Sequence, residues 1–133
     1  MKSSVVASEE FFPGTEIVIE GRSPSGNCCA IFEDNGETGY FYANAISGEN
    51  YEVLDALHIY SLEEVTDREI SSTAVILWSS DNQKVALLIN RIPHAVFDFS
   101  SRRGYCRDNF PEPDKESGWS RDGWDDALRE LFT

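Results

Sequence analysis

The chain has two histidines, and each lies within four residues of an aspartate. Imidazole is the side chain best suited to exchange protons near neutral pH, and a nearby carboxylate can orient its ring. If both pairs faced one cleft, they could carry out general acid–base catalysis. The candidate catalytic residues are therefore Asp55, His58, His94 and Asp98.

Each pair also has a structural interpretation. Asp98 could cap a turn or pair with a neighbouring arginine, while His94 simply begins a strand after a proline. Asp55 lies in an otherwise apolar stretch and needs a hydrogen-bond donor, which the arginines of residues 100–118 could supply. Period-two alternation predicts that Asp55 shares a face with Val53, and that His58 shares the opposite face with Tyr60. Sequence alone leaves both interpretations open.

Other kinds of active site have little support. The chain lacks a Gly-x-Ser-x-Gly elbow and a glycine-rich phosphate loop, and the serines at 79–80 and 100–101 have no defined base beside them. Its three cysteines, Cys28, Cys29 and Cys106, form neither a complete disulfide framework nor a metal-ligand spacing. Cys106 precedes Arg107, whose charge favours a reactive thiolate. The acidic stretch 33–37 lacks the spacing of a calcium loop. We expect no metal and no cofactor.

Acidic residues are concentrated in the first half of the chain. Residues 1–70 contain fourteen Asp and Glu against three Lys and Arg, whereas residues 71–133 contain ten against eight. Such a field repels nucleic acid and membranes and attracts basic partners. The acidic binding candidates are Glu33, Asp34, Glu37, Glu63, Glu64 and Asp67. Trp78 and Arg103 are binding candidates of an alternative pocket, with Arg103 as an anion anchor.

About seven short strands separated by turns are predicted between residues 15 and 99. They cover residues 15–20, 28–33, 40–44, 52–60, 72–78, 84–89 and 94–99. Asn35-Gly36 predicts a hairpin with a type I′ turn. This spacing is typical of a mainly β, antiparallel sandwich or barrel. Trp124, Leu128 and Leu131 predict a C-terminal helix that packs on the sheet. Residues 1–10 have no periodicity and are expected to be flexible.

The chain has 133 residues, of which 41% are hydrophobic, enough for a single domain spanning residues 1–133. Its apolar runs are too short to cross a bilayer, and its start does not resemble a signal peptide. We therefore expect a soluble cytoplasmic protein of unknown oligomeric state.

Three stretches together resemble a bacterial family of small proteins that is catalogued as a domain of unknown function. They are the segment from Phe32 to Tyr42, the segment from Leu54 to Tyr60, and Trp78-Ser79 together with residues 93–99. The resemblance implies a bacterial, single-domain protein and offers no established activity.

The leading functional hypothesis is a binding or inhibitory protein whose acidic surface meets a basic protein, as bacterial immunity proteins do. The alternative is a small-ligand-binding protein or an enzyme with a pocket of histidine and aspartate side chains. The first predicts binding that depends strongly on salt, whereas the second predicts binding that does not.

Overall fold

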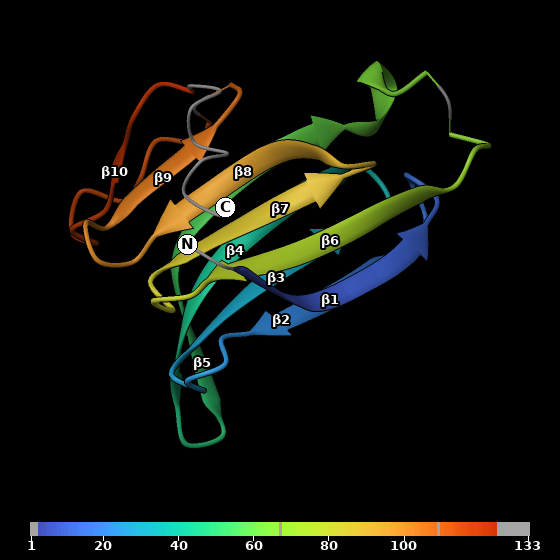
Figure 1. Ribbon diagram of the computed structural model, residues 1–133. Coiled ribbons are helices and arrows are strands. Elements are labelled where there is room, and N and C mark those ends of the chain that lie inside the picture. Colours follow the sequence, from blue (N-terminus) through green and yellow to red (C-terminus); the bar gives the residue numbers. More distant parts are fainter. Residues whose placement is uncertain (1–2, 67, 109, 125–133) are drawn as a thin grey trace.

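A computed structural model describes residues 3–66, 68–108 and 110–124, which form two β-sheets (Figure 1). The four-stranded sheet has the order β2-β3-β4-β5. Its strands are β2 (Ile17–Arg22), β3 (Cys28–Asp34), β4 (Thr38–Ser47) and β5 (Asn50–Ser61). The six-stranded sheet has the order β1-β6-β7-β8-β9-β10. Its strands are β1 (Ser3–Phe11), β6 (Ser72–Ser79), β7 (Lys84–Ile89), β8 (Ile92–Asp98), β9 (Arg103–Cys106) and β10 (Ser120–Arg121).

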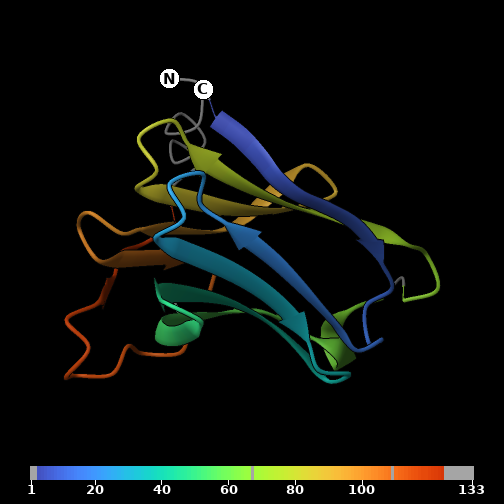
Figure 2. The same cartoon turned by 90° about the horizontal axis from the view of Figure 1, so that it is seen from below.

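The two sheets lie face to face as the layers of a sandwich (Figure 2). Alternate residues of each strand point between the layers, so that large side chains such as Phe32 and Trp78 are fully buried. The rings of Phe41 in β4 and Phe97 in β8 stack with centroids 5.3 Å apart. This contact joins the two sheets at the centre of the core.

The mainly β prediction and the seven strands predicted between residues 15 and 99 are confirmed, whereas the barrel alternative is wrong. β2 to β8 are the seven predicted strands, and β1, β9 and β10 outside that range bring the described residues to ten strands in two open sheets. Nearly all pairs are antiparallel, and the short β10 runs parallel to β9. The added strands include β9 and β10, which are too short to show a period.

The first strand was not predicted, because residues 3–10 are rich in serine and glutamate. The structure places them in β1, which pairs with β6 along its length at the edge of the six-stranded sheet. An edge strand leaves one side to solvent, so polar side chains such as Glu9 and Glu10 remain exposed. The segment expected to be flexible is thus largely part of a sheet.

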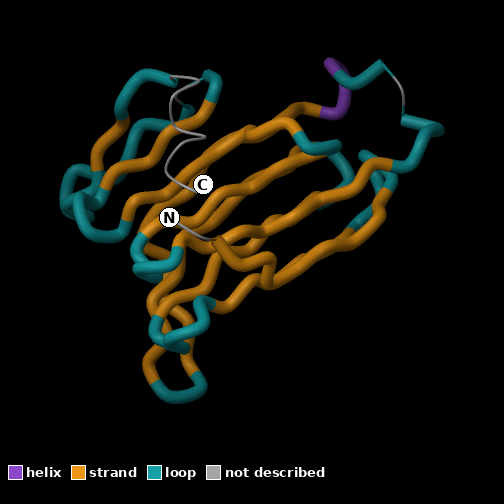
Figure 3. Tube along the Cα trace, viewed as in Figure 1, coloured by secondary structure: helices purple, strands orange, loops and turns teal. Residues whose placement is uncertain are grey.

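The predicted C-terminal helix falls on residues 125–133, which lie outside the described residues. Residues 122–124 have no regular secondary structure. The helical segment in the described part of the chain is η1 (Leu62–Glu64), a single 3₁₀ turn after β5 (Figure 3). Within residues 3–66, 68–108 and 110–124 there is no helix long and apolar enough to cross a bilayer.

The hairpin between β3 and β4 is confirmed, but its turn differs from the predicted type. Of its two central residues, Gly36 alone has a positive φ, at 95°. The side-chain oxygen of Asn35 accepts hydrogen bonds from the amides of Glu37 and Thr38, both at 2.9 Å. A loop stabilised by its own asparagine therefore replaces the type I′ turn.

Two β-bulges in β5 change which side chains face the core. The pairing with β4 shifts between Ala43 and Asn44 and again between Gly39 and Tyr40. Each extra residue reverses the alternation. As a result Val53 is 60% exposed although Asp55 is buried, and Tyr60 packs against the core although His58 does not. The predicted grouping of these residues by face is therefore wrong.

Candidate functional site

Asp55 faces the interior, where it pairs with Arg121 of β10. Arg121 Nη2 donates to Asp55 Oδ1 at 2.8 Å and to the carbonyl of Ala56 at 2.8 Å, and Arg121 Nη1 contacts the second carboxylate oxygen. Both side chains are buried, to 9% and 4% exposure. The prediction of a buried pair is confirmed, but the donor lies beyond residues 100–118.

The Asp55–Arg121 pair is enclosed by β9. A Cβ placed on Gly104 would lie 3.0 Å from Arg121 Nη1 and 3.1 Å from Asp55 Oδ2. Only a glycine allows the backbone to come this close without displacing the pair. The carboxylate is therefore closed off on the side of β9.

The second candidate pair, on β8, also takes up structural positions. Asp98 accepts hydrogen bonds from the amides of Ser100 and Ser101 and from the Ser100 hydroxyl, so it caps the turn before β9. His94 lies at a shift in the β7–β8 pairing. Burial, helped by the charge of Arg107, lowers the pKa of His94 to about 4. The structure does not bring the four candidates into one cleft.

His58 lies on the outer face of the four-stranded sheet, between two polar partners. Its Nδ1 is 2.5 Å from Asp108 Oδ2, and its Nε2 is 3.0 Å from Ser61 Oγ. The backbone amide of His58 donates to the carbonyl of Phe110 at 2.7 Å and ties the 107–111 loop to β5. A carboxylate, an imidazole and a hydroxyl thus form a continuous hydrogen-bonded chain.

Four rings form a row on this face, which we call the aromatic row: Tyr40, Tyr42, His58 and Phe110. Tyr40 and Tyr42 stack with centroids 6.0 Å apart, and His58 makes edge contacts with Tyr40 at 5.5 Å and with Phe110 at 5.8 Å. Phe110 is 54% exposed, and the nearby β2 residue Val18 is 59% exposed. Tyr40, Tyr42 and His58 are partly buried, so the row is partly accessible from solvent, chiefly at Phe110.

Carboxylates border the aromatic row at one end of the sheet. Glu33 accepts a hydrogen bond from the Tyr42 hydroxyl at 3.3 Å. Glu16 lies beside the β3–β4 turn, and Glu37 and Glu63 line a cleft of about 420 Å³ together with Ser61 and Arg68. We call Glu16, Glu33, Glu37 and Glu63 the acidic rim. Aromatic and acidic groups thus share one surface.

The other binding candidates lie elsewhere. Trp78 is fully buried and donates from Nε1 to the carbonyl of Gly21 at 3.1 Å. Asp34 is 1% exposed and accepts hydrogen bonds from the amides of Gly14 and Gly36 and from the Tyr60 hydroxyl. Both predictions are wrong, because these polar atoms are used to hold turns and core together.

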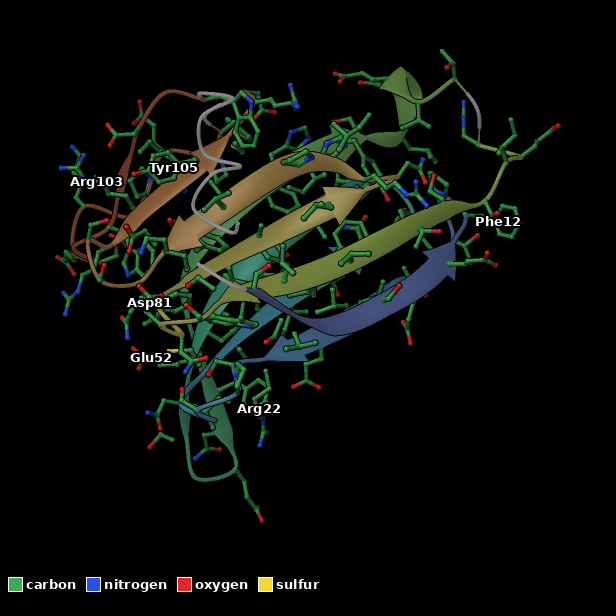
Figure 4. All side chains as sticks on the ribbon, in the orientation of Figure 1. Phe12, Arg22, Glu52, Asp81, Arg103 and Tyr105 are labelled. Carbon is green, nitrogen blue, oxygen red and sulfur yellow. The ribbon has the colours of Figure 1, made fainter. Side chains whose placement is uncertain are left out.

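Three binding candidates remain. Glu64 is exposed on η1. Arg103 extends from β9 near Tyr105 (Figure 4) and pairs with Asp122. Asp67 lies outside the described residues.

Metal and thiol chemistry have no support in residues 3–66, 68–108 and 110–124. No group of three or more His, Cys, Asp and Glu side chains there has the geometry of a metal site. Burial and the neighbouring Asp108 carboxylate raise the pKa of Cys106 to about 11, so this thiol is not the reactive group that its sequence neighbour suggested.

Sequence reasoning found His58 but missed its partners. Asp108 lies fifty positions from His58, so no local pattern connects them. Ser61 follows His58 by three positions and looks like an ordinary residue at a strand end. One sequence signal did point to the surface around His58, because Tyr40 and Tyr42 alternate onto one face of their strand.

The chain is similar to bacterial proteins. It is 36% identical over 115 residues to a protein of Haemophilus influenzae that carries the name uncharacterized protein, covering 86% of this chain and 71% of the relative. No solved structure matches. A family model described as an uncharacterized protein conserved in bacteria (DUF2251) matches residues 11–133, and the chain belongs to this family.

Proposed function

We propose that this is a binding protein whose four-stranded sheet presents a surface for a basic protein partner. The observation that carries the proposal is the aromatic row, a partly exposed set of rings bordered by carboxylates on the outer face of that sheet. Protein interfaces combine a centre rich in aromatic residues with a polar rim. This surface has both components.

Charge supports a basic partner in particular. Residues 12–66, which include the whole four-stranded sheet, contain ten Asp and Glu and a single arginine, Arg22. Only Asp34 and Asp55 of the ten are buried. The remaining carboxylates generate a field that speeds the approach of a cationic surface. Tyrosine faces add direct attraction for arginine and lysine side chains.

Titration of charge-neutralised variants with a basic peptide tests the proposal. We expect octa-arginine peptide to bind at low salt, with affinity that falls steeply as salt increases. The variant Glu33→Gln/Glu37→Gln should bind more weakly, whereas Glu9→Gln/Glu10→Gln on β1 removes the same charge from the other sheet and should bind as the wild type does. Isothermal titration calorimetry measures both. Equal weakening in the two variants would show a general charge effect and contradict a specific surface.

The aromatic row provides a second arm of the same experiment. Tyr40→Ala/Tyr42→Ala should weaken octa-arginine binding by about 1–2 kcal/mol, or about 5- to 30-fold. The matched control is Tyr105→Ala on the six-stranded sheet, for which we expect no change. Unchanged binding in the first variant would mean that the rings take no part.

A further inference from the structure

We infer that Ser61, His58 and Asp108 form a nucleophilic site that hydrolyses carboxylic esters in the cleft beside η1. The order of atoms carries this inference. Asp108 Oδ2 lies 2.5 Å from His58 Nδ1, and His58 Nε2 lies 3.0 Å from Ser61 Oγ. A carboxylate, an imidazole and a hydroxyl in this order activate the hydroxyl as a nucleophile in unrelated folds.

The contacts of Asp108 determine the tautomer of His58. An ionised carboxylate only accepts hydrogen bonds, so Nδ1 of His58 carries the proton and Nε2 is left to accept from the Ser61 hydroxyl. Partial burial acts to raise the pKa of Asp108, but hydrogen bonds from His58, the Phe110 amide and Cys106 outweigh it and lower the pKa below its usual value. The orienting carboxylate is thus held in its ionised form.

The imidazole is also held in place by packing. Its ring makes edge contacts with Tyr40 and with Phe110, and its side chain is 12% exposed. The other oxygen of Asp108 accepts from the Phe110 amide at 3.0 Å. A base fixed at both nitrogens needs little reorganisation before it takes a proton.

Ser61 lies between His58 and an open cleft. It borders the cleft of about 420 Å³ that Glu37, Glu63 and Arg68 also line. Ser61 precedes η1, yet its side chain does not cap that turn and instead contacts His58. Two carboxylates against one guanidinium favour neutral or cationic esters over anionic ones.

The reaction follows from these positions. Ser61 Oγ forms a bond to the ester carbonyl carbon while His58 Nε2 accepts the hydroxyl proton. The carbon–oxygen bond of the leaving alcohol then breaks, and His58 Nε2 returns the proton to that oxygen, leaving an acyl ester on Ser61. Water attacks this ester in the same way, with His58 as base, and releases a carboxylic acid and the free serine. Asp108 remains a carboxylate throughout.

A covalent probe tests the site. A fluorophosphonate should form a phosphorus–oxygen bond to Ser61 with loss of fluoride, detected as one adduct by intact mass and located by peptide mapping. Ser61→Ala should abolish the adduct, and Asp108→Asn should slow its formation about 100-fold, the scale of general base catalysis. Ser47→Ala, which removes an exposed hydroxyl at the end of β4, should label as the wild type does.

Ester hydrolysis gives the second readout. Turnover of 4-nitrophenyl acetate by the wild type should fall to the buffer rate in Ser61→Ala, with circular dichroism confirming that the variant folds. A folded wild type that forms no adduct on Ser61, or hydrolyses the ester no faster than Ser61→Ala, would overturn the inference. Ser61→Ala should still bind octa-arginine, so failure here and failure of the proposed binding surface are distinguishable.

Discussion

Strand β5 presents a polar side chain on each of its faces, and the two have opposite environments. Asp55 points inward to a buried arginine, and glycine backbone closes over the pair. His58, three residues later, points outward to a carboxylate that is 45% exposed and to a serine beside a cleft. The charged partners, Arg121 of Asp55 and Asp108 of His58, both come from the segment after β8.

The side chains on the two faces of β5 are therefore suited to different roles. A buried ion pair surrounded by core atoms holds β10 against β5 but offers nothing to a ligand. An imidazole at the surface, oriented by partners and next to open space, can act on a bound molecule. We therefore propose a structural role for the inner face of β5 and a functional role for its outer face.

Breaking the inner pair should have the largest effect. Arg121→Leu leaves the Asp55 carboxylate buried without its cation, and we expect the free energy of unfolding to fall by about 3–5 kcal/mol. Urea denaturation monitored by tryptophan fluorescence measures this change. The double variant Asp55→Leu/Arg121→Leu removes both charges and should recover much of the loss. A double variant no more stable than Arg121→Leu would contradict the structural role of the pair.

Breaking the outer contact should have a smaller effect on stability. Asp108→Asn weakens one hydrogen bond at the surface, so we expect a loss of about 1 kcal/mol in the free energy of unfolding. The same denaturation measurement applies. A loss as large as that of Arg121→Leu would mean that His58 and Asp108 are chiefly structural, which would remove the contrast between the two faces.

His94 lies on β8, so its effect on stability can be compared with the effects of the two faces of β5. Burial lowers the pKa of His94 from 6.5 to about 4, so between these pH values the unfolded chain binds a proton that the folded chain does not. The stability that depends on an unprotonated His94 is therefore present in full above pH 6.5 and is lost as the pH falls from 6.5 towards 4. His94→Gln should flatten that part of the stability curve in urea titrations at several pH values. An unchanged slope would show that His94 is not the group responsible.

The sequence predicted the strands whose apolar residues alternate, because each of them buries one face. It predicted the β3–β4 hairpin for a similar reason, since Asn35 and Gly36 have a local preference for turns. It did not predict β1, whose edge position tolerates Glu9 and Glu10. Sequence patterns thus predict strands with a buried face well and polar edge strands poorly.

The candidate site was less predictable than the fold. His58 stood out by its type, but a bulge decided that it faces outward while Tyr60 faces the core. Its contact with Asp108 depends on a loop fifty positions away. Local periodicity contains neither kind of information, because bulges and long-range contacts are settled by the packing of the whole sandwich.

A residue-resolved map of binding tests whether the outer face of the four-stranded sheet is the functional surface. Octa-arginine peptide is titrated into the isotope-labelled protein at low salt, and amide chemical shifts are followed by nuclear magnetic resonance. We expect the largest shifts at Tyr40, Tyr42, His58 and Phe110, with Leu88 and Val96 of the other sheet unchanged. Shifts confined to the six-stranded sheet, or spread evenly over the chain, would contradict this expectation.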